Sequence, residues 1–199
     1  MRPLLLLLLT MPALPACKKD RAVITIDGVS ASVPDDWVPM DEERVEQLRE
    51  AARSSDPSVE VAMVGRRPPN AKMPWMYVQR TVIRPHLAKP LQAAKVIDGT
   101  LNELKGALTE SGLELVSSTS SSAPESRETC FVTKSKTTAP VLNHTCMRLW
   151  VGQKSKAVHT VSVVCLAMVD EPAECQRVLD SRQLTASNAL PLDQDLSPD

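Results

Sequence analysis

The sequence predicts an α+β protein in which helices pack on one mainly antiparallel β-sheet. The first observation is the order of elements: a strand pair, a helix, two strands, a long helix, then three or four strands and a closing helix. The second is the segment 91–111, whose apolar residues recur every three or four positions and form one stripe for packing. The third is the segment 158–169, which is apolar on both faces, as in a covered central strand.

The N-terminal half contains a hairpin, a helix and a strand pair. Residues 23–33 hold two β-rich runs separated by Asp27-Gly28, a dipeptide typical of hairpin turns. A helix is expected over 39–53, because Asp41 can cap it and acidic residues follow in its first turn. Strands are expected over 59–65 and 75–83, joined by the Pro-rich loop 66–73.

The C-terminal half continues with strands after the long helix. Gly112 occupies the position of a left-handed helix cap, and a strand begins at Leu113. The serine-rich run 117–122 either continues this strand or loops out. Further elements are expected at the following ranges: strands at 129–137, 144–151 and 158–169, and a helix at 171–184.

The first residues have the layout of an export signal: Arg2, then six leucines, then small and turn-forming residues. The apolar run is too short to span a membrane, which needs about 20 residues. Leu14-Pro15-Ala16-Cys17 resembles the lipobox of bacterial lipoproteins, although Pro15 replaces the more usual small residue. The resemblance implies lipidation of Cys17 and a membrane partner; plain secretion is the alternative. Lys18, rather than Asp, after the cysteine favours the outer membrane, with the domain facing the periplasm.

These features predict four segments: a lipoprotein signal peptide at 1–16, a tether at 17–22, one α+β domain at 23–185 and a flexible C-terminal tail at 186–199. Removal of the first 16 of 199 residues leaves 183, enough for one domain with a core. The mature chain would hold 22 Lys and Arg against 24 Asp and Glu, since the full chain has 23 against 24 and loses only Arg2. This balance argues against a nucleic-acid partner.

Four cysteines follow the signal, and an even number in an exported protein predicts two disulfides. If 129–137 and 144–151 form a hairpin that turns around 138–140, Cys130 lies opposite Cys146. Cys165 and Cys175 would then tie the central strand to the last helix. Free thiols, metal ligands or a redox pair are the alternatives, but the sequence has no CxxC motif.

The run VSASVPDDW, residues 29–37, resembles the opening strand and Pro-x-x-Trp turn of the PsbP-like and DcrB-like α/β sandwich family. The order of elements extends the resemblance over about 23–184. It implies a non-enzymatic accessory or assembly factor and carries over no catalytic residues. Disulfides are not a hallmark of that family.

The sequence contains no catalytic motif of a hydrolase, a nucleotide-binding protein or a dinucleotide enzyme. His86, His144 and His159 are scattered, and His144-x-Cys146 is the one pairing that suggests a metal. Since Cys146 already has a better partner in Cys130, we expect no metal. Because no catalytic motif is present, we also expect no enzymatic activity, and we expect no cofactor.

The functional candidate is a surface. Trp75 and Tyr77 point to the opposite strand face from Met76 and Val78, so they need cover from a helix or from a partner. If exposed, they would form a docking patch with three arginines, Arg66, Arg67 and Arg80. We therefore expect a lipid-anchored cell-envelope protein that binds an unidentified envelope partner; the alternative is an envelope hydrolase or small-ligand carrier.

Overall fold

The computed structural model describes residues 20–53, 59–71, 73–136, 140–170 and 172–197. Its elements, in chain order, are β1 (Arg21–Ile26), β2 (Val29–Pro34), β3 (Val38–Pro39), α1 (Glu42–Arg53), β4 (Glu60–Arg67), β5 (Trp75–Ile83), β6 (Leu91–Gln92), α2 (Ala93–Glu110), β7 (Leu113–Ala123), β8 (Ser126–Ser135), β9 (Val141–Val151), β10 (Val158–Met168), α3 (Ala173–Asp180), β11 (Gln183–Leu184) and β12 (Asp195–Leu196). The predicted α+β class is confirmed.

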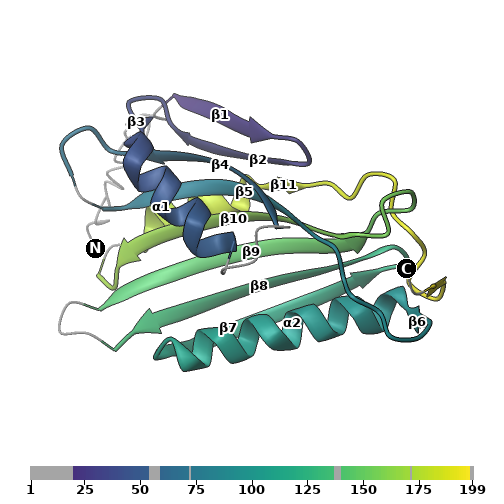
Figure 1. Ribbon diagram of the computed structural model, residues 1–199. Helices are drawn as coiled ribbons and strands as arrows, with labels where there is room; N and C mark the ends of the chain where they lie inside the picture. Colours follow the sequence, from purple (N-terminus) through teal and green to yellow (C-terminus); the bar gives the residue numbers. More distant parts are fainter. Residues whose placement is uncertain (1–19, 54–58, 72, 137–139, 171, 198–199) are drawn as a thin grey trace, which may run out of the picture.

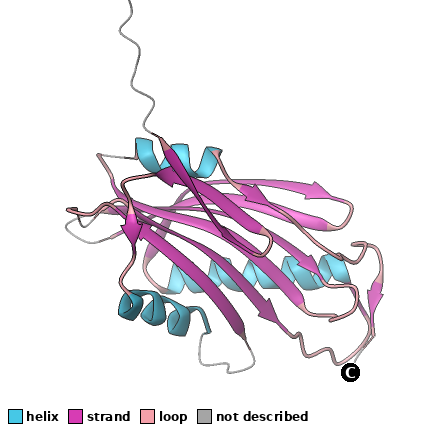
Figure 2. Cartoon of the chain, turned by 90° about the horizontal axis from the view of Figure 1, so that it is seen from above, coloured by secondary structure: helices cyan, strands magenta, loops and turns pink. Residues whose placement is uncertain are grey.

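A seven-stranded antiparallel sheet forms the centre of the molecule, in the order β3-β4-β5-β10-β9-β8-β7 (Figure 1). The smaller sheet β1-β2-β11 lies over one face of it, and α3 packs on that same face. Helices α1 and α2 cover the other face at its two ends, beside β4–β5 and β7–β8 respectively (Figures 1 and 2). The sheet is therefore covered on both sides.

The hairpin and the central strand form as the sequence predicts. Ile26 pairs with Val29 across Asp27-Gly28, and Gly28 takes a φ of 83°, which a residue without Cβ adopts at little cost. Strand β10 lies between β5 and β9. Its alternate side chains Val161 and Val163 are fully buried under β1–β2, while Val158 and Val164 are buried on the helical side. Continuous apolar character thus follows from burial on two faces.

The cysteine register is also as expected. Cys130 pairs with Cys146 across β8 and β9, and the turn at 137–139 lies outside the described residues. The structure contains both bridges, Cys130–Cys146 with Cα atoms 4.0 Å apart and Cys165–Cys175 at 5.4 Å. The second bridge joins β10 to α3, so that the closing helix is held against the β1–β2 side of the sheet.

The C-terminal segment corrects the prediction of a flexible tail at 186–199. Leu190, Leu192 and Leu196 are buried in the core beneath α2, and β12 pairs with β6. Backbone bonds from Ala93 and Ala94 to Gln194 and Leu192 hold this segment at the start of α2. These leucines complete a core that α2 alone leaves open, so residues 186–197 belong to the domain.

Smaller differences concern element ends. The strand predicted from residue 23 begins at Arg21, inside the expected tether. The serine-rich run continues β7, and the expected helix at 171–184 ends at Asp180 before β11. Cys17 and the signal segment lie outside the described residues.

Candidate functional site

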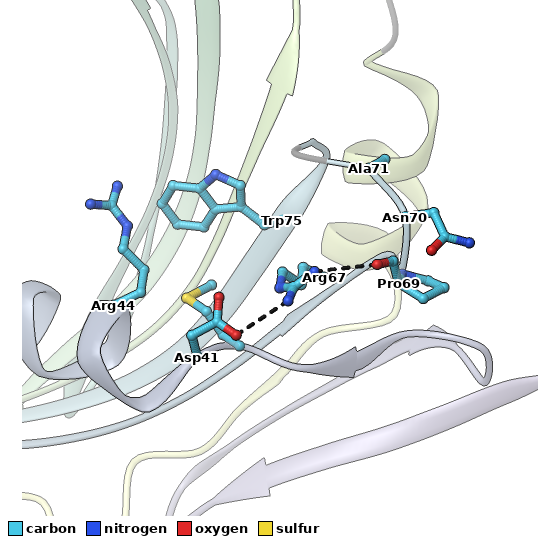
Figure 3. Close-up of a pocket in the computed structure, with 8 residues that line it drawn as sticks. Asp41, Arg44, Arg67, Pro69, Asn70, Ala71 and Trp75 are labelled. Atoms are coloured by element: carbon cyan, nitrogen blue, oxygen red, sulfur yellow. Dashed lines mark hydrogen bonds and ion pairs between the residues drawn. The ribbon is translucent and has the colours of Figure 1, made fainter.

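An open cleft of about 390 Å³ lies where α1 begins, between the ends of β4 and β5. Asp41 and Arg44 come from the start of α1, Arg67 from the last position of β4, and Trp75 from the first position of β5. The loop residues Pro69, Asn70 and Ala71 close the far side (Figure 3). The cleft is therefore built from two stretches of the chain, 40–44 and 67–71 with Trp75, which the fold brings together.

Glycine at position 65 allows the approach of β3 and α1 to β4. The amide of Met40 donates to the carbonyl of Gly65 at 3.1 Å. A Cβ at position 65 would lie 2.8 Å from the Met40 Cε, which is closer than side-chain atoms approach. The absence of a side chain at position 65 thus lets the Met40 side chain pack against β4 and line the cleft.

The polar side of the cleft is formed by Arg67, which contacts one carboxylate and two backbone carbonyls. Arg67 Nη2 donates to Asp41 Oδ1 at 3.2 Å, and its Nη1 faces the carbonyls of Pro68 and Pro69 at 3.4 and 3.5 Å. Its Nε is buried and has no hydrogen-bond partner among the described residues. These contacts fix the guanidinium at the mouth of the cleft.

The aromatic side is formed by Trp75 with Arg44. The guanidinium carbon of Arg44 lies 5.5 Å from the centre of the Trp75 ring, within the range of a cation–π interaction. Trp75 stacks on Tyr77 at 6.0 Å between ring centres. Tyr77 packs beneath α1 with Met63 and Val45, and burial raises its pKa to about 12. The phenol is therefore a neutral support for the tryptophan ring.

The structure divides the arginines expected in one patch between two faces. Arg67 shares the α1 face with Trp75 and Tyr77, whereas Arg66 lies opposite Met76 on the other face. Arg80 is on that other face too: it pairs with Asp27 at 2.6 Å and contacts His159 Nδ1 at 3.4 Å. The five-residue patch is therefore wrong as a single surface, because strand alternation separates its members.

Trp75 and Tyr77 also differ in how far the rest of the protein covers them. Helix α1 covers Tyr77, as expected of intramolecular packing, while Trp75 also lines the open cleft. The sequence analysis missed Arg44, because a charged residue in the first turn of a helix is usually exposed to solvent and has no binding role. The position of Arg44 three residues after Asp41, on the same side of the helix, was the available signal.

The histidines and cysteines of the described residues lie away from the cleft. Its described lining includes neither histidine nor cysteine. Across the described ranges, no three His, Cys, Asp or Glu side chains gather in a way that could hold a metal ion. His144 is buried in β9 beside the disulfides, and His159 stacks on Trp150 at 5.3 Å. The helices of the described part are all too short or too polar to cross a bilayer.

Comparisons with known proteins find a likeness in shape only. No protein-family model and no curated protein matches the sequence. Among solved structures, the solution structure of cyanobacterial PsbP (CyanoP) from Synechocystis sp. PCC 6803 matches with 12% identity and a TM-score of 0.45, over 83% of this chain and 92% of that one. That protein has the type of fold named by the sequence resemblance. At this identity and TM-score the match assigns neither a family nor an activity.

Proposed function

We propose that the protein is a lipid-anchored accessory protein of the bacterial cell envelope, which docks a partner protein in the cleft of Arg44, Arg67 and Trp75. The observation that carries this proposal is the pairing of an accessible tryptophan with two oriented arginines. Tryptophan and arginine dominate the binding energy of protein interfaces. The described lining of the cleft has two arginines, Arg44 and Arg67, and one acidic residue, Asp41. Its net positive charge suits an acidic segment of the partner.

The position of the cleft supports a partner close to the membrane. The amide of Asp35 donates to the carbonyl of Asp20 at 3.2 Å, and β3, which follows, pairs Val38 with Arg67. The start of the domain and the cleft thus lie at the same end of the large sheet (Figure 1). Cys17 precedes Asp20 by three positions, a reach of about 10 Å when extended. A lipid on Cys17 would hold the cleft near the bilayer surface.

The anchor is tested by comparing the wild type with Cys17→Ser in the native bacterium. We expect the wild type in the membrane fraction, with a diacylglyceryl mass on Cys17, and the variant either unprocessed or soluble. A correctly cleaved Cys17→Ser chain that stays in membranes, or an unmodified Cys17 in the wild type, contradicts lipidation.

Docking is tested by site-specific photo-crosslinking in the native envelope. A photoreactive residue at position 71, which lines the cleft and to which docking assigns no role, is expected to form one discrete protein adduct, which Trp75→Ala and Arg67→Ala each abolish. The matched control carries the same residue at position 177, because Arg177 is an exposed arginine on α3, over the opposite face. Equal adducts at both positions, or adducts with phospholipid alone, contradict a protein partner at the cleft.

A further inference from the structure

A second polar region lies on the face of the large sheet opposite α1 and α2. One open cavity of about 490 Å³ is lined by Glu128, Arg148 and Arg182 together with 183–185. An adjoining cavity of about 280 Å³ runs between α3 and β7 over the Cys130–Cys146 bridge, and Arg182 lines it as well. His144, buried in β9, borders this second cavity. The two hollows therefore meet at Arg182.

The charge of the first cavity is unbalanced. Arg148 Nη2 donates to one oxygen of Glu128 at 2.6 Å, and Arg182 Nη2 donates to the other at 2.9 Å. Two guanidinium groups thus share one carboxylate. Among the described residues that line this cavity, Glu128 is the only acidic one. Burial favours a raised pKa for Glu128, but the hydrogen bonds from the two arginines outweigh it and lower the pKa. The carboxylate stays ionised, and the cluster carries one net positive charge.

The same cluster has unused hydrogen-bonding capacity. The Nε atoms of Arg148 and Arg182 and the Nε2 atom of His144 are buried without a partner in the described part of the chain. The side chains of Arg148 and Arg182 are 31% and 27% exposed, so solvent compensates their charge only in part. A partly desolvated cation without its full set of partners is costly unless a counter-ion is present.

Glu128 also prepares the geometry of the two arginines. The guanidinium of Arg182 is held between Glu128 and the carbonyl of Leu179, to which Nη1 donates at 2.9 Å. Arg148 is held by Glu128 from the neighbouring strand, since the two residues are paired across β8 and β9. Nη1 of Arg148 makes no hydrogen bond to the described residues. Glu128 and Leu179 use only part of the N–H groups of the two guanidinium groups. The remaining ones can donate to the oxygens of a small carboxylate or phosphate in the cavity.

We propose that this cavity is a binding site for a small oxyanion, a carboxylate or a phosphate, which Arg148 and Arg182 hold while Glu128 positions them. The bound group completes the charge balance of the cluster. The site is independent of the docking cleft, because it lies on the opposite face of the sheet and shares no lining residue with it.

The direct test is calorimetric titration of the folded, disulfide-bonded protein with inorganic phosphate and, separately, with acetate, at constant ionic strength. We expect saturable binding of one anion per chain for at least one of the two. The anion that binds more tightly identifies the ligand class as phosphate or carboxylate. If neither titration saturates, the proposal is overturned.

The location is tested with Arg148→Gln, whose affinity is expected to fall about tenfold or more, because a charged hydrogen bond is lost. Arg49→Gln is the matched control, since it removes an ion-paired arginine of similar exposure, 29%, that lines neither the docking cleft nor this cavity. Equal affinities in the two variants overturn the assignment. If Arg148→Gln does not fold, Arg148→Lys decides. It keeps the positive charge beside Glu128 but removes the forked N–H donors, so weaker binding is expected. An unchanged affinity overturns the assignment.

Discussion

Burial of the phenol of Tyr77 sets its response to high pH. Because burial disfavours the phenolate, the pKa lies at about 12, above the ordinary value of 10.0. The unfolded chain therefore releases this proton first. The contribution of Tyr77 to the free energy of unfolding is complete below pH 10 and falls as the pH rises from 10 to 12. Absorbance titration of this single tyrosine should give a midpoint near 12; a midpoint at 10 contradicts its burial.

A buried histidine responds in the opposite direction. Burial lowers the pKa of His144 below the ordinary 6.5, since the charged imidazolium would lose its hydration. The unfolded chain then binds the proton more readily, so the stability due to neutral His144 is present above pH 6.5 and falls in more acid solution. Proton NMR should give His144 a midpoint below that measured in urea. Equal midpoints would contradict the prediction.

The two disulfides act at the scale of elements, and magnitudes rank them. Each closes a loop of 16 or 10 residues and is worth about 3 kcal/mol, with the longer loop ahead by about 0.4 kcal/mol. Packing reverses this order. Cys165 and Cys175 are both fully buried, whereas Cys130 is partly exposed. Removing a buried sulfur atom leaves a cavity that costs about 1 kcal/mol of stability.

We therefore expect the double variant Cys165→Ala/Cys175→Ala to lose more stability than Cys130→Ala/Cys146→Ala. Both should lower the melting temperature, by roughly 6 to 12 °C for a chain of this size. Calorimetry of both variants measures the order. A wild-type melting temperature in either variant would show that its bridge does not stabilise the fold.

The C-terminal segment makes a second prediction at this scale. Leu196 is 1% exposed and packs beneath α2, so Leu196→Ala should cost about 2–5 kcal/mol in the free energy of unfolding. Leu115→Ala is the matched control, because Leu115 is 53% exposed on β7 and should change stability by less than about 0.5 kcal/mol. Urea denaturation distinguishes the two. Similar small losses would mean that the segment does not complete the core.

At the scale of the whole molecule, one sheet joins the two cores. Strand β10 places Val161 and Val163 in the core under β1–β2 and Val158 in the core under α2, so loss of packing on one face disturbs the strand that supports the other. We expect a single cooperative transition, in which helical circular dichroism and tryptophan fluorescence change at the same temperature. Two separate midpoints would show that the faces unfold independently.

Several features could be predicted from the sequence because near neighbours determine them. Asp27-Gly28 sets a two-residue turn, apolar spacing sets the long helix, and the alternation of β8 and β9 sets the cysteine register. The same alternation could have separated Arg80 from Tyr77, since an odd number of positions divides them on one strand. The buried spacing of leucines at 190, 192 and 196 was a signal too, hidden by the prolines and aspartates around it.

By itself, the sequence determined the class of fold, most element positions, the disulfide partners and the expectation of an anchor at Cys17. The tertiary structure alone decided what α1 covers and where the C-terminal segment packs. It also placed Arg182 on Glu128, 54 residues away along the chain. The reason is physical: turns and periodicities depend on neighbouring residues, whereas a cleft or a charge cluster depends on which distant segments pack together to bury apolar surface.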